Sequence, residues 1–107
     1  MTRDPECIFC KIAAGEIPSE KVYEDERVLA FRDIHPIAPV HILFIPKHHV
    51  ATLNDIADDD PILLHVLAAV RKVARDVGIA DQGYRVLMNV NREGGQVIFH
   101  YHLHLLA

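Results

Sequence analysis

The chain reads His100-Tyr101-His102-Leu103-His104-Leu105-Leu106 just before its last residue, Ala107. Successive side chains of a β-strand point to opposite faces, so residues two apart share a face. The alternation therefore predicts a strand, within 97–106, that has three imidazoles on one face and apolar side chains on the other. An apolar face suits a hydrophobic core, whereas a row of imidazoles suits chemistry near neutral pH.

Length and composition indicate one folded domain over residues 1–107, because half of the 107 residues are hydrophobic. The formal net charge is −4, and the absence of a long basic stretch argues against a nucleic-acid partner. The sequence has neither an apolar run of about 20 residues nor the apolar segment of a secretory signal at its start. We therefore expect a cytoplasmic protein that is not attached to a membrane.

Hydrophobic periodicity and turn residues predict two helices and five strands. The short helix covers 5–14, with Pro5 in its first turn and Gly15 after its end. The long helix covers 61–77. The strands cover 20–24, 27–32, 40–45, 83–91 and 97–106. Hairpins with helices between them indicate an α+β fold with a five-stranded antiparallel sheet.

The long helix shows the clearest signals in the sequence. Pro61 stands at its expected first position, after three aspartates that suit a helix N-terminus, and Gly78 closes it. Apolar residues at helical spacing predict one buried face. The expected members of that face are Leu63, Leu67, Val70, Ala74 and Val77.

Three interpretations of the histidine row remain open from the residues alone. The row is a metal site if a His-x-His pair chelates zinc, or a phosphoryl-transfer site if one imidazole is the nucleophile. Chance histidines on a partly exposed strand are the third interpretation. The three imidazoles span roughly 13 Å at the rise of a strand. This spread favours separate roles over one shared ion.

Two shorter motifs accompany the row. Gly94-Gly95-Gln96 precedes it, and glycines let backbone N–H groups approach an anion, although an ordinary hairpin turn has the same composition. Cys7 and Cys10 have the Cys-x-x-Cys spacing, which in a cytosolic chain indicates metal or redox chemistry. The alternative is a pair of reduced, partly buried thiols.

These motifs together resemble the histidine-triad (HIT) family, whose mark is three histidines alternating with apolar residues. The resemblance covers nearly the whole chain and is closest to the branch that hydrolyses purine nucleoside phosphoramidates. It is carried by Cys7-Ile8-Phe9-Cys10-Lys11-Ile12, Gly15-Glu16-Ile17-Pro18, Phe31-Arg32-Asp33-Ile34, Pro39-Val40-His41, Ile45-Pro46-Lys47-His48-His49, Asn89, Gly94-Gly95-Gln96 and the histidine row.

The resemblance implies a hydrolase that cleaves nucleoside 5′-phosphoramidates, or related α-phosphate esters and anhydrides, through a nucleotidyl-histidine intermediate. It implies that His102 is the nucleophile, that His104 and His41 contact phosphate oxygens, and that His100 belongs to the catalytic row or to a metal site. The expected ligand is a purine nucleotide of the AMP or GMP type. The expected assembly is a homodimer in which the long helix and a strand join two five-stranded sheets.

The resemblance also assigns the nucleotide pocket. Ile8, Phe9 and Phe31 would form the apolar wall for the base. Asp33, with Ile34 beside it, would accept hydrogen bonds from the ribose hydroxyls. The expected phosphate cradle consists of Asn89 and the Gly95 backbone, followed by Gln96 and Val97.

Members that retain the two cysteines are similar to this chain in binding zinc through two later histidines. By position the four ligands would be Cys7, Cys10, His49 and His100, with His48 the competitor of His49. A Cys2His2 set is a closed, structural zinc site, which here would fasten the N-terminal helix to the sheet. No organic cofactor is expected.

The chain departs from the family pattern in two respects. Val97 stands where the phosphoramidase branch usually has serine or threonine, and valine can neither donate nor accept a hydrogen bond. The family also continues past the histidines with a glycine-rich tail, so we expect a further segment after Ala107. The missing hydroxyl supports an alternative function, a purine-nucleotide binding or regulatory module with weak or vestigial catalysis.

Overall fold

The computed structural model describes residues 3–107 and has the α+β architecture that the sequence predicts. The two α-helices are α1 (Ile8–Ala13) and α2 (Ile62–Asp76). Five strands form one sheet in the order β1-β2-β3-β5-β4, and each adjacent pair is antiparallel. The strands are β1 (Lys21–Glu24), β2 (Val28–Arg32), β3 (His41–Pro46), β4 (Arg85–Leu87) and β5 (Leu103–Leu106), and two 3-10 turns are η1 (Leu53–Asp55) and η2 (Arg92–Gly94).

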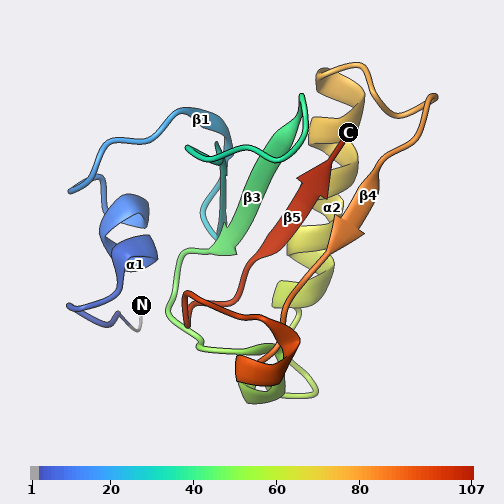
Figure 1. Cartoon of the computed structure of the whole chain (residues 1–107). Helices are drawn as coiled ribbons and strands as arrows, with labels where there is room; N and C mark the ends of the chain where they lie inside the picture. Colours follow the sequence, from blue (N-terminus) through green and yellow to red (C-terminus); the bar gives the residue numbers. More distant parts are fainter. Residues whose placement is uncertain (1–2) are drawn as a thin grey trace.

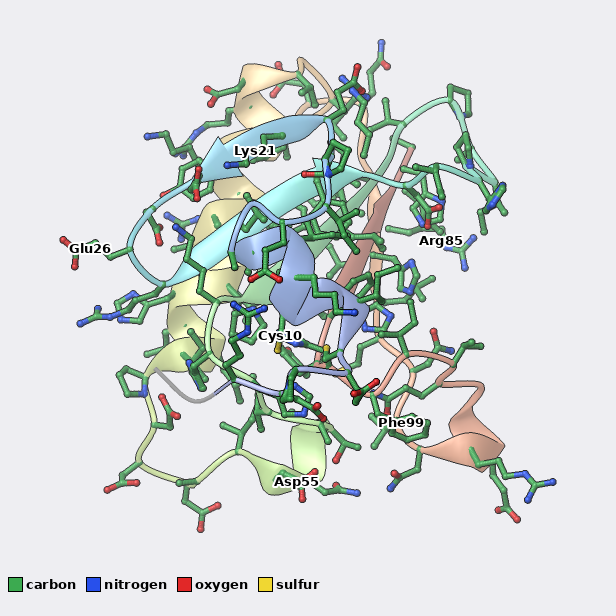
Figure 2. The ribbon with its side chains drawn as sticks, turned by 90° about the vertical axis from the view of Figure 1, so that its left-hand side faces the viewer. Cys10, Lys21, Glu26, Asp55, Arg85 and Phe99 are labelled. Carbon is green, nitrogen blue, oxygen red and sulfur yellow. The ribbon has the colours of Figure 1, made fainter. Side chains whose placement is uncertain are left out.

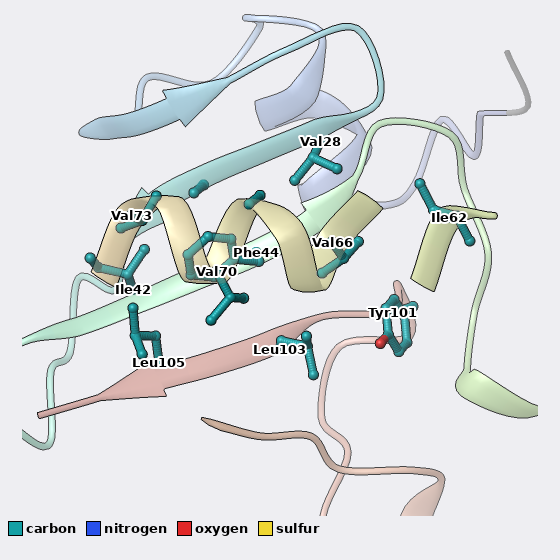
Figure 3. Close-up of a cluster of buried hydrophobic side chains, with 12 residues drawn as sticks. Val28, Ile42, Phe44, Ile62, Val66, Val70, Val73, Tyr101, Leu103 and Leu105 are labelled. Atoms are coloured by element: carbon teal, nitrogen blue, oxygen red, sulfur yellow. The ribbon is translucent and has the colours of Figure 1, made fainter. Parts of the chain in front are cut away.

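The sheet lies between the two helices, so its central strands are covered on both faces (Figure 1). Alternate residues of β2 and β3 therefore enter two different hydrophobic clusters. The cluster against α2 contains Ala30, Phe44 and Leu103, whereas the cluster on the α1 side contains Phe9, Phe31 and Leu43. Figure 3 shows the first cluster, in which Tyr101, Leu103 and Leu105 pack toward α2.

The apolar residues of the histidine row therefore lie in the α2 core, and the histidines face the α1 side. This confirms the predicted alternation of faces. The regular strand is shorter than expected, however, because β5 comprises only Leu103–Leu106 rather than 97–106. Residues 97–102 leave the ladder, and the N–H of Tyr101 donates instead to the Val50 carbonyl at 2.7 Å. The expected strand 83–91 likewise shortens to Arg85–Leu87.

The short helix begins later than the predicted residue 5. Cys7 has an extended backbone and serves as the N-cap, and its Sγ accepts a hydrogen bond from the Cys10 N–H at 3.4 Å. Pro5 therefore lies before the helix, in a turn that the Cys7 N–H closes on the Asp4 carbonyl. The helix ends before Gly15, whose φ of 79° suits glycine.

The long helix is confirmed, but its expected buried face was wrong by part of a turn. Leu67 is 47% exposed and Leu63 is only half-buried. Val70 and Ala74 are buried as expected, and four further positions turn inward, because an apolar surplus on a helix allows two orientations and the sheet selects one. The buried residues are Ile62, Val66, Ala69, Val70, Val73 and Ala74. The helix starts at Ile62, where the Asp60 carboxylate accepts the backbone N–H at 2.9 Å.

Within residues 3–107 neither helix has the length and apolar character needed to cross a membrane. The cytoplasmic location expected from the sequence stays a prediction.

Candidate active site and thiol-histidine cluster

The three histidines of the row occupy one continuous site, although only His104 lies on the regular strand β5. The rings of His102 and His104 are 5.1 Å apart, centroid to centroid, and Phe9 of α1 contacts both His100 and His102 edge-on. His100 is fully buried, while His102 is 8% exposed. The row therefore runs from a closed end at His100 to a more open end at His104.

At the closed end, His100 is oriented by a backbone carbonyl. Its Nε2 lies 2.8 Å from the carbonyl oxygen of Pro46, and because that oxygen can only accept, Nε2 carries the proton. The lone pair is therefore on Nδ1, which lies 3.3 Å from Sγ of Cys7 and 3.6 Å from Sγ of Cys10. An imidazole lone pair directed at two thiols is a donor arrangement suited to a metal ion.

The central histidine, His102, also donates to a backbone carbonyl, but through its other ring nitrogen. Nδ1 of His102 donates to the carbonyl oxygen of His100 at 2.7 Å, so the lone pair of this ring is on Nε2. Burial lowers the pKa of His102, so the ring keeps that lone pair at neutral pH. The Nε2 atom of His102 therefore carries a free lone pair.

At the open end, His104 is hydrogen-bonded to His41, which also lies close to the Asp33 carboxylate. The backbone N–H of Ile37 donates to Nδ1 of His41 at 3.2 Å, which leaves the proton on Nε2. That Nε2 lies 2.9 Å from Nδ1 of His104 and 3.4 Å from Oδ2 of Asp33. With Nδ1 accepting, His104 carries its own proton on Nε2, where it can donate to an anion.

The antiparallel register brings these two histidines together. His41 pairs with Leu106 and Leu43 pairs with His104, so His41 and His104 are diagonal neighbours on the same face. Burial lowers the pKa of His104 to about 4, and the charges of His102 and His41 add to that shift. The ring is therefore a neutral donor at pH 7.

Asp33, His41 and His104 have ligand atoms within 4.8 Å of one another, as a metal site would. The hydrogen bonds argue against that use. Because the Ile37 N–H occupies Nδ1 of His41, the Nε2 atom facing the group carries a proton and has no lone pair to offer. This disfavours the interpretation of the histidine row as a set of zinc ligands.

A second group, Cys7, Cys10, His49 and His100, fits a metal ion better. The donor atoms all lie within 4.8 Å of one another, and Sγ of Cys10 is 3.4 Å from Nδ1 of His49. Tetrahedral zinc with Zn–S and Zn–N bonds of about 2.3 and 2.0 Å separates its ligand atoms by about 3.3–3.8 Å. The Cys–His distances of 3.3–3.6 Å match that spacing.

An apolar cleft of about 270 Å³ adjoins the open end of the row. All five residues expected at the base and ribose line it, namely Ile8, Phe9, Phe31, Asp33 and Ile34. Phe9 connects the cleft to the histidines, because its ring lies 5.5 Å from Phe31 and 5.2 Å from His102. Sequence reasoning missed the other apolar lining residues, Ile12, Ile17, Leu43 and Ile98, which read as ordinary core positions.

The glycine-rich loop differs from the expected anion cradle. The backbone N–H groups of Gly94, Gly95 and Gln96 all donate within the turn, to the carbonyls of Asn91 and Arg92. The loop is shaped by a left-handed Gly95, with φ 83°, and by Asn89, whose side-chain N–H donates to the Gly94 carbonyl at 2.7 Å. The hairpin-turn interpretation therefore describes its backbone better than an anion nest.

Two neighbouring residues also differ in setting from their expected roles. The buried Gln96 side chain donates to the carbonyls of Ala51 and Ile98 and accepts from the Asn91 N–H, so its amide is engaged within the fold. Val97, in contrast, is 87% exposed and lines a shallow hollow with Cys7 and Ile8. The sequence offered no signal for the carbonyls of Pro46 and His100, because backbone groups carry no residue signature.

Comparison with known proteins supports the resemblance. The HIT domain family matches residues 14–107. The purine nucleoside phosphoramidase of Escherichia coli (strain K12) is 50% identical over 103 residues, which are 95% of this chain and 87% of that protein.

Two solved structures share the fold. The HIT family hydrolase from Legionella pneumophila Philadelphia 1 is 53% identical with a TM-score of 0.93, over 95% of this chain and 92% of that chain. A histidine triad protein from Clostridium difficile is 50% identical with a TM-score of 0.97, over 99% of this chain and 93% of that chain. By domain match, sequence identity and fold, this chain belongs to the histidine-triad (HIT) family.

Proposed function

We propose that this protein is a hydrolase of purine nucleoside 5′-phosphoramidates, with His102 as the nucleophile. Support comes from HIT hydrolases among its relatives and from the name of the 50% identical protein of Escherichia coli, a purine nucleoside phosphoramidase. The cleft beside the row has the mostly apolar wall and the single carboxylate that a nucleoside needs.

One observation carries the proposal more than any other. The hydrogen bond from Nδ1 of His102 to the His100 carbonyl leaves Nε2 unprotonated, and no base is needed to activate it. His104 presents an Nε2–H beside it, which suits a phosphate oxygen in the transition state. A nucleophile and a donor side by side are the two groups that nucleotidyl transfer requires.

The reaction then has two steps. In the first, Nε2 of His102 forms a bond to the α-phosphorus while the P–N bond breaks and the departing amine takes up a proton. In the second, water cleaves the phosphorus–histidine bond, which releases the nucleoside monophosphate, frees His102 and returns a proton. Asp33 is proposed to accept from the ribose hydroxyls, and Phe9 and Phe31 to enclose the base.

The deciding experiment compares His102→Ala with His65→Ala, a control at a half-buried histidine of α2. The His102 variant should lose at least about 10⁴-fold in kcat on an adenosine phosphoramidate, because the nucleophile is gone. Calorimetry should still detect AMP binding. Turnover at the parental rate in His102→Ala would refute the assignment.

The alternative of a binding or regulatory module is favoured by one feature, the exposed Val97 where the phosphoramidase branch has a hydroxyl. AMP titration beside turnover of several α-phosphate substrates separates the two functions. Firm AMP binding with background turnover on every substrate would support the module.

We further propose that Cys7, Cys10, His49 and His100 hold one structural zinc ion. The donor set and its spacing support this assignment. Bound zinc would supply no reaction chemistry here, because four protein ligands leave no open position for water or substrate. Its proposed role is to tie α1 to the end of the sheet.

We also propose a homodimer formed through α2 and β4. β4 is an edge strand of the sheet, and three apolar side chains on the two elements are exposed: Leu64 (72%), Leu67 (47%) and Val86 (40%). A second copy that covers them would also pair the strand edge. Sedimentation should show a dimer that Leu67→Glu weakens, and a monomeric parent would overturn the proposal.

A further inference from the structure

We propose that the thiol-histidine cluster (Cys7, Cys10, His49 and His100) is the positioning device for His102 and for the Phe9 wall, so its metal occupancy sets nucleotide affinity and nucleophile readiness. The inference rests on the proposed nucleotide site, but its first readout does not depend on turnover. The structure connects the cluster to the site by two separate routes.

The first route runs through His100, whose side chain belongs to the cluster and whose backbone carbonyl binds His102. Its ring faces the two thiols through Nδ1 and is held from behind by the Pro46 carbonyl. Its own carbonyl oxygen accepts the Nδ1–H of His102 at 2.7 Å. Residues 97–102 lie outside the sheet ladder, so regular strand bonds do not hold this carbonyl in place. The direction of the carbonyl, and with it the tautomer of His102, therefore depends on how firmly the His100 side chain is held.

The second route runs through α1. This helix has six residues, and so short a helix is not stable by itself in water. Cys10 fixes its buried side at the cluster, and the adjacent Phe9 projects its ring to 5.9 Å from His100 and 5.2 Å from His102. Figure 2, seen from the side that carries α1, shows Cys10 on this helix in front of the sheet.

Phe9 also lines the nucleotide cleft and meets Phe31 edge-on at 5.5 Å. A shift of α1 would therefore move a wall of the base pocket and uncover the ring of the nucleophile at once. Metal binding would restrict the His100 ring and α1 together, because both supply ligand atoms to it. Groups that orient a functional residue in this way typically change affinity or activity by about 10–100-fold when removed.

The adjacent pair His49 and His48 offers a matched test. His49→Asn removes one donor from the cluster, whereas His48→Asn changes a neighbour outside it. Metal analysis of the purified proteins should find zinc in the parent and in His48→Asn, and little in His49→Asn. Nitrogen-15 NMR of the imidazoles, at one fixed neutral pH, then reports which nitrogen of His102 carries the proton.

We expect the parent and His48→Asn to show His102 protonated at Nδ1 only. His49→Asn should show a mixture of both tautomers, and its AMP affinity should fall about tenfold. His49→Cys supplies a replacement thiolate ligand, so it should restore zinc, the single tautomer and the AMP affinity together.

The proposal would be overturned if His49→Asn lacks zinc yet keeps the single His102 tautomer and parental AMP affinity. The cluster would then have a structural role only. If that variant does not fold, parent protein stripped by a chelator replaces it, with zinc re-addition as the rescue. Failure of the parent to hydrolyse any phosphoramidate would defeat the proposed activity alone, because the tautomer shift would still be measurable.

Discussion

The two ends of the histidine row use one residue type for two chemistries. At the closed end the Nε2–H of His100 donates to a carbonyl, and the lone pair on Nδ1 faces two thiols. At the open end His104 accepts on Nδ1 from His41 and turns an N–H outward. The hydrogen-bond partner of one ring nitrogen decides whether the other nitrogen offers a lone pair, as a metal ligand does, or an N–H, as a hydrogen-bond donor does.

His102 lies between these ends and belongs to neither group. Its Nδ1–H donates to the His100 carbonyl and its Nε2 keeps a free lone pair, so the row contains the proposed metal ligand, nucleophile and phosphate donor in sequence order. The hydrogen-bond partner of one ring nitrogen, an acceptor for His100 and His102 but a donor for His104, therefore decides what the other nitrogen can do.

Of the changes at the two ends, the one at the open end has the larger expected effect. His104→Ala removes the Nε2–H proposed to contact the phosphate, and loss of such a donor typically costs about 10²–10³-fold in kcat. Zinc content should change little, because the closed cluster does not contain this ring. A variant that also loses its zinc would show that the two ends are not independent.

A change at the closed end should instead lower zinc content and stability. Cys7→Ser removes a sulfur 3.3 Å from Nδ1 of His100, so zinc content should fall from about one ion per chain to almost none. The free energy of unfolding should fall by about 2–4 kcal/mol, because metal binding to the native state is lost. Metal analysis and urea unfolding measure both quantities.

The control for that experiment is Glu6→Gln, an exposed neighbour of Cys7 outside the cluster. It should keep both the zinc and the stability of the parent. Zinc that persists in Cys7→Ser would mean that the histidine row holds the ion, and the distinction between the two ends would then fail.

The pH dependence of stability offers a subtler comparison. Burial, followed by the nearby His102 and His41, lowers the pKa of His104 to about 4, while Asp33 opposes the shift. Between about pH 6.5 and 4, therefore, His104 binds a proton in the unfolded chain but not in the folded protein. The stability is complete above pH 6.5 and is lost as the pH falls toward 4.

After a discount for its partial exposure, the contribution of His104 is on the order of 2 kcal/mol. Thermal unfolding at about pH 7, 5.5 and 4.5 should show a steeper loss in the parent than in His104→Gln, which cannot be charged. Parallel curves for the two proteins would show that His104 is not held neutral by its surroundings.

The sequence was sufficient for whatever depends on side-chain alternation. Tyr101, Leu103 and Leu105 enter the α2 core, and the histidines face the other way, as the period of two requires. The cleft residues Phe9, Phe31 and Asp33 also come together as expected. These features follow from local pattern and from motifs that the HIT family shares.

What the sequence could not show depends on backbone hydrogen bonds. Gly94 and Gly95 suggested free N–H groups, yet the turn conformation uses each of them internally. The buried face of α2 was predicted only in part, because Leu67 and Val66 are both apolar and only packing on the sheet distinguishes them. The tautomers of the row likewise depend on carbonyls that no residue letter reveals.

The smallest expected effect concerns Val97, which precedes the histidine row in the sequence. It shares a shallow hollow with Cys7 and Ile8, is 87% exposed, and can offer no hydrogen bond. Val97→Ser adds a hydroxyl at an exposed position, so thermal stability should change by less than about 0.5 kcal/mol.

If the chain is an enzyme whose leaving group lacks one hydrogen-bond partner, kcat on an adenosine phosphoramidate should rise about 3–10-fold in Val97→Ser. That range corresponds to the 0.5–1.5 kcal/mol or so of a single hydrogen bond. Val97→Thr, which keeps the branched shape, should follow, while Val97→Ala should not. Turnover that stays at background in all three variants while AMP binds normally would favour the binding module, because the missing hydroxyl would then not be what limits the chemistry at His102.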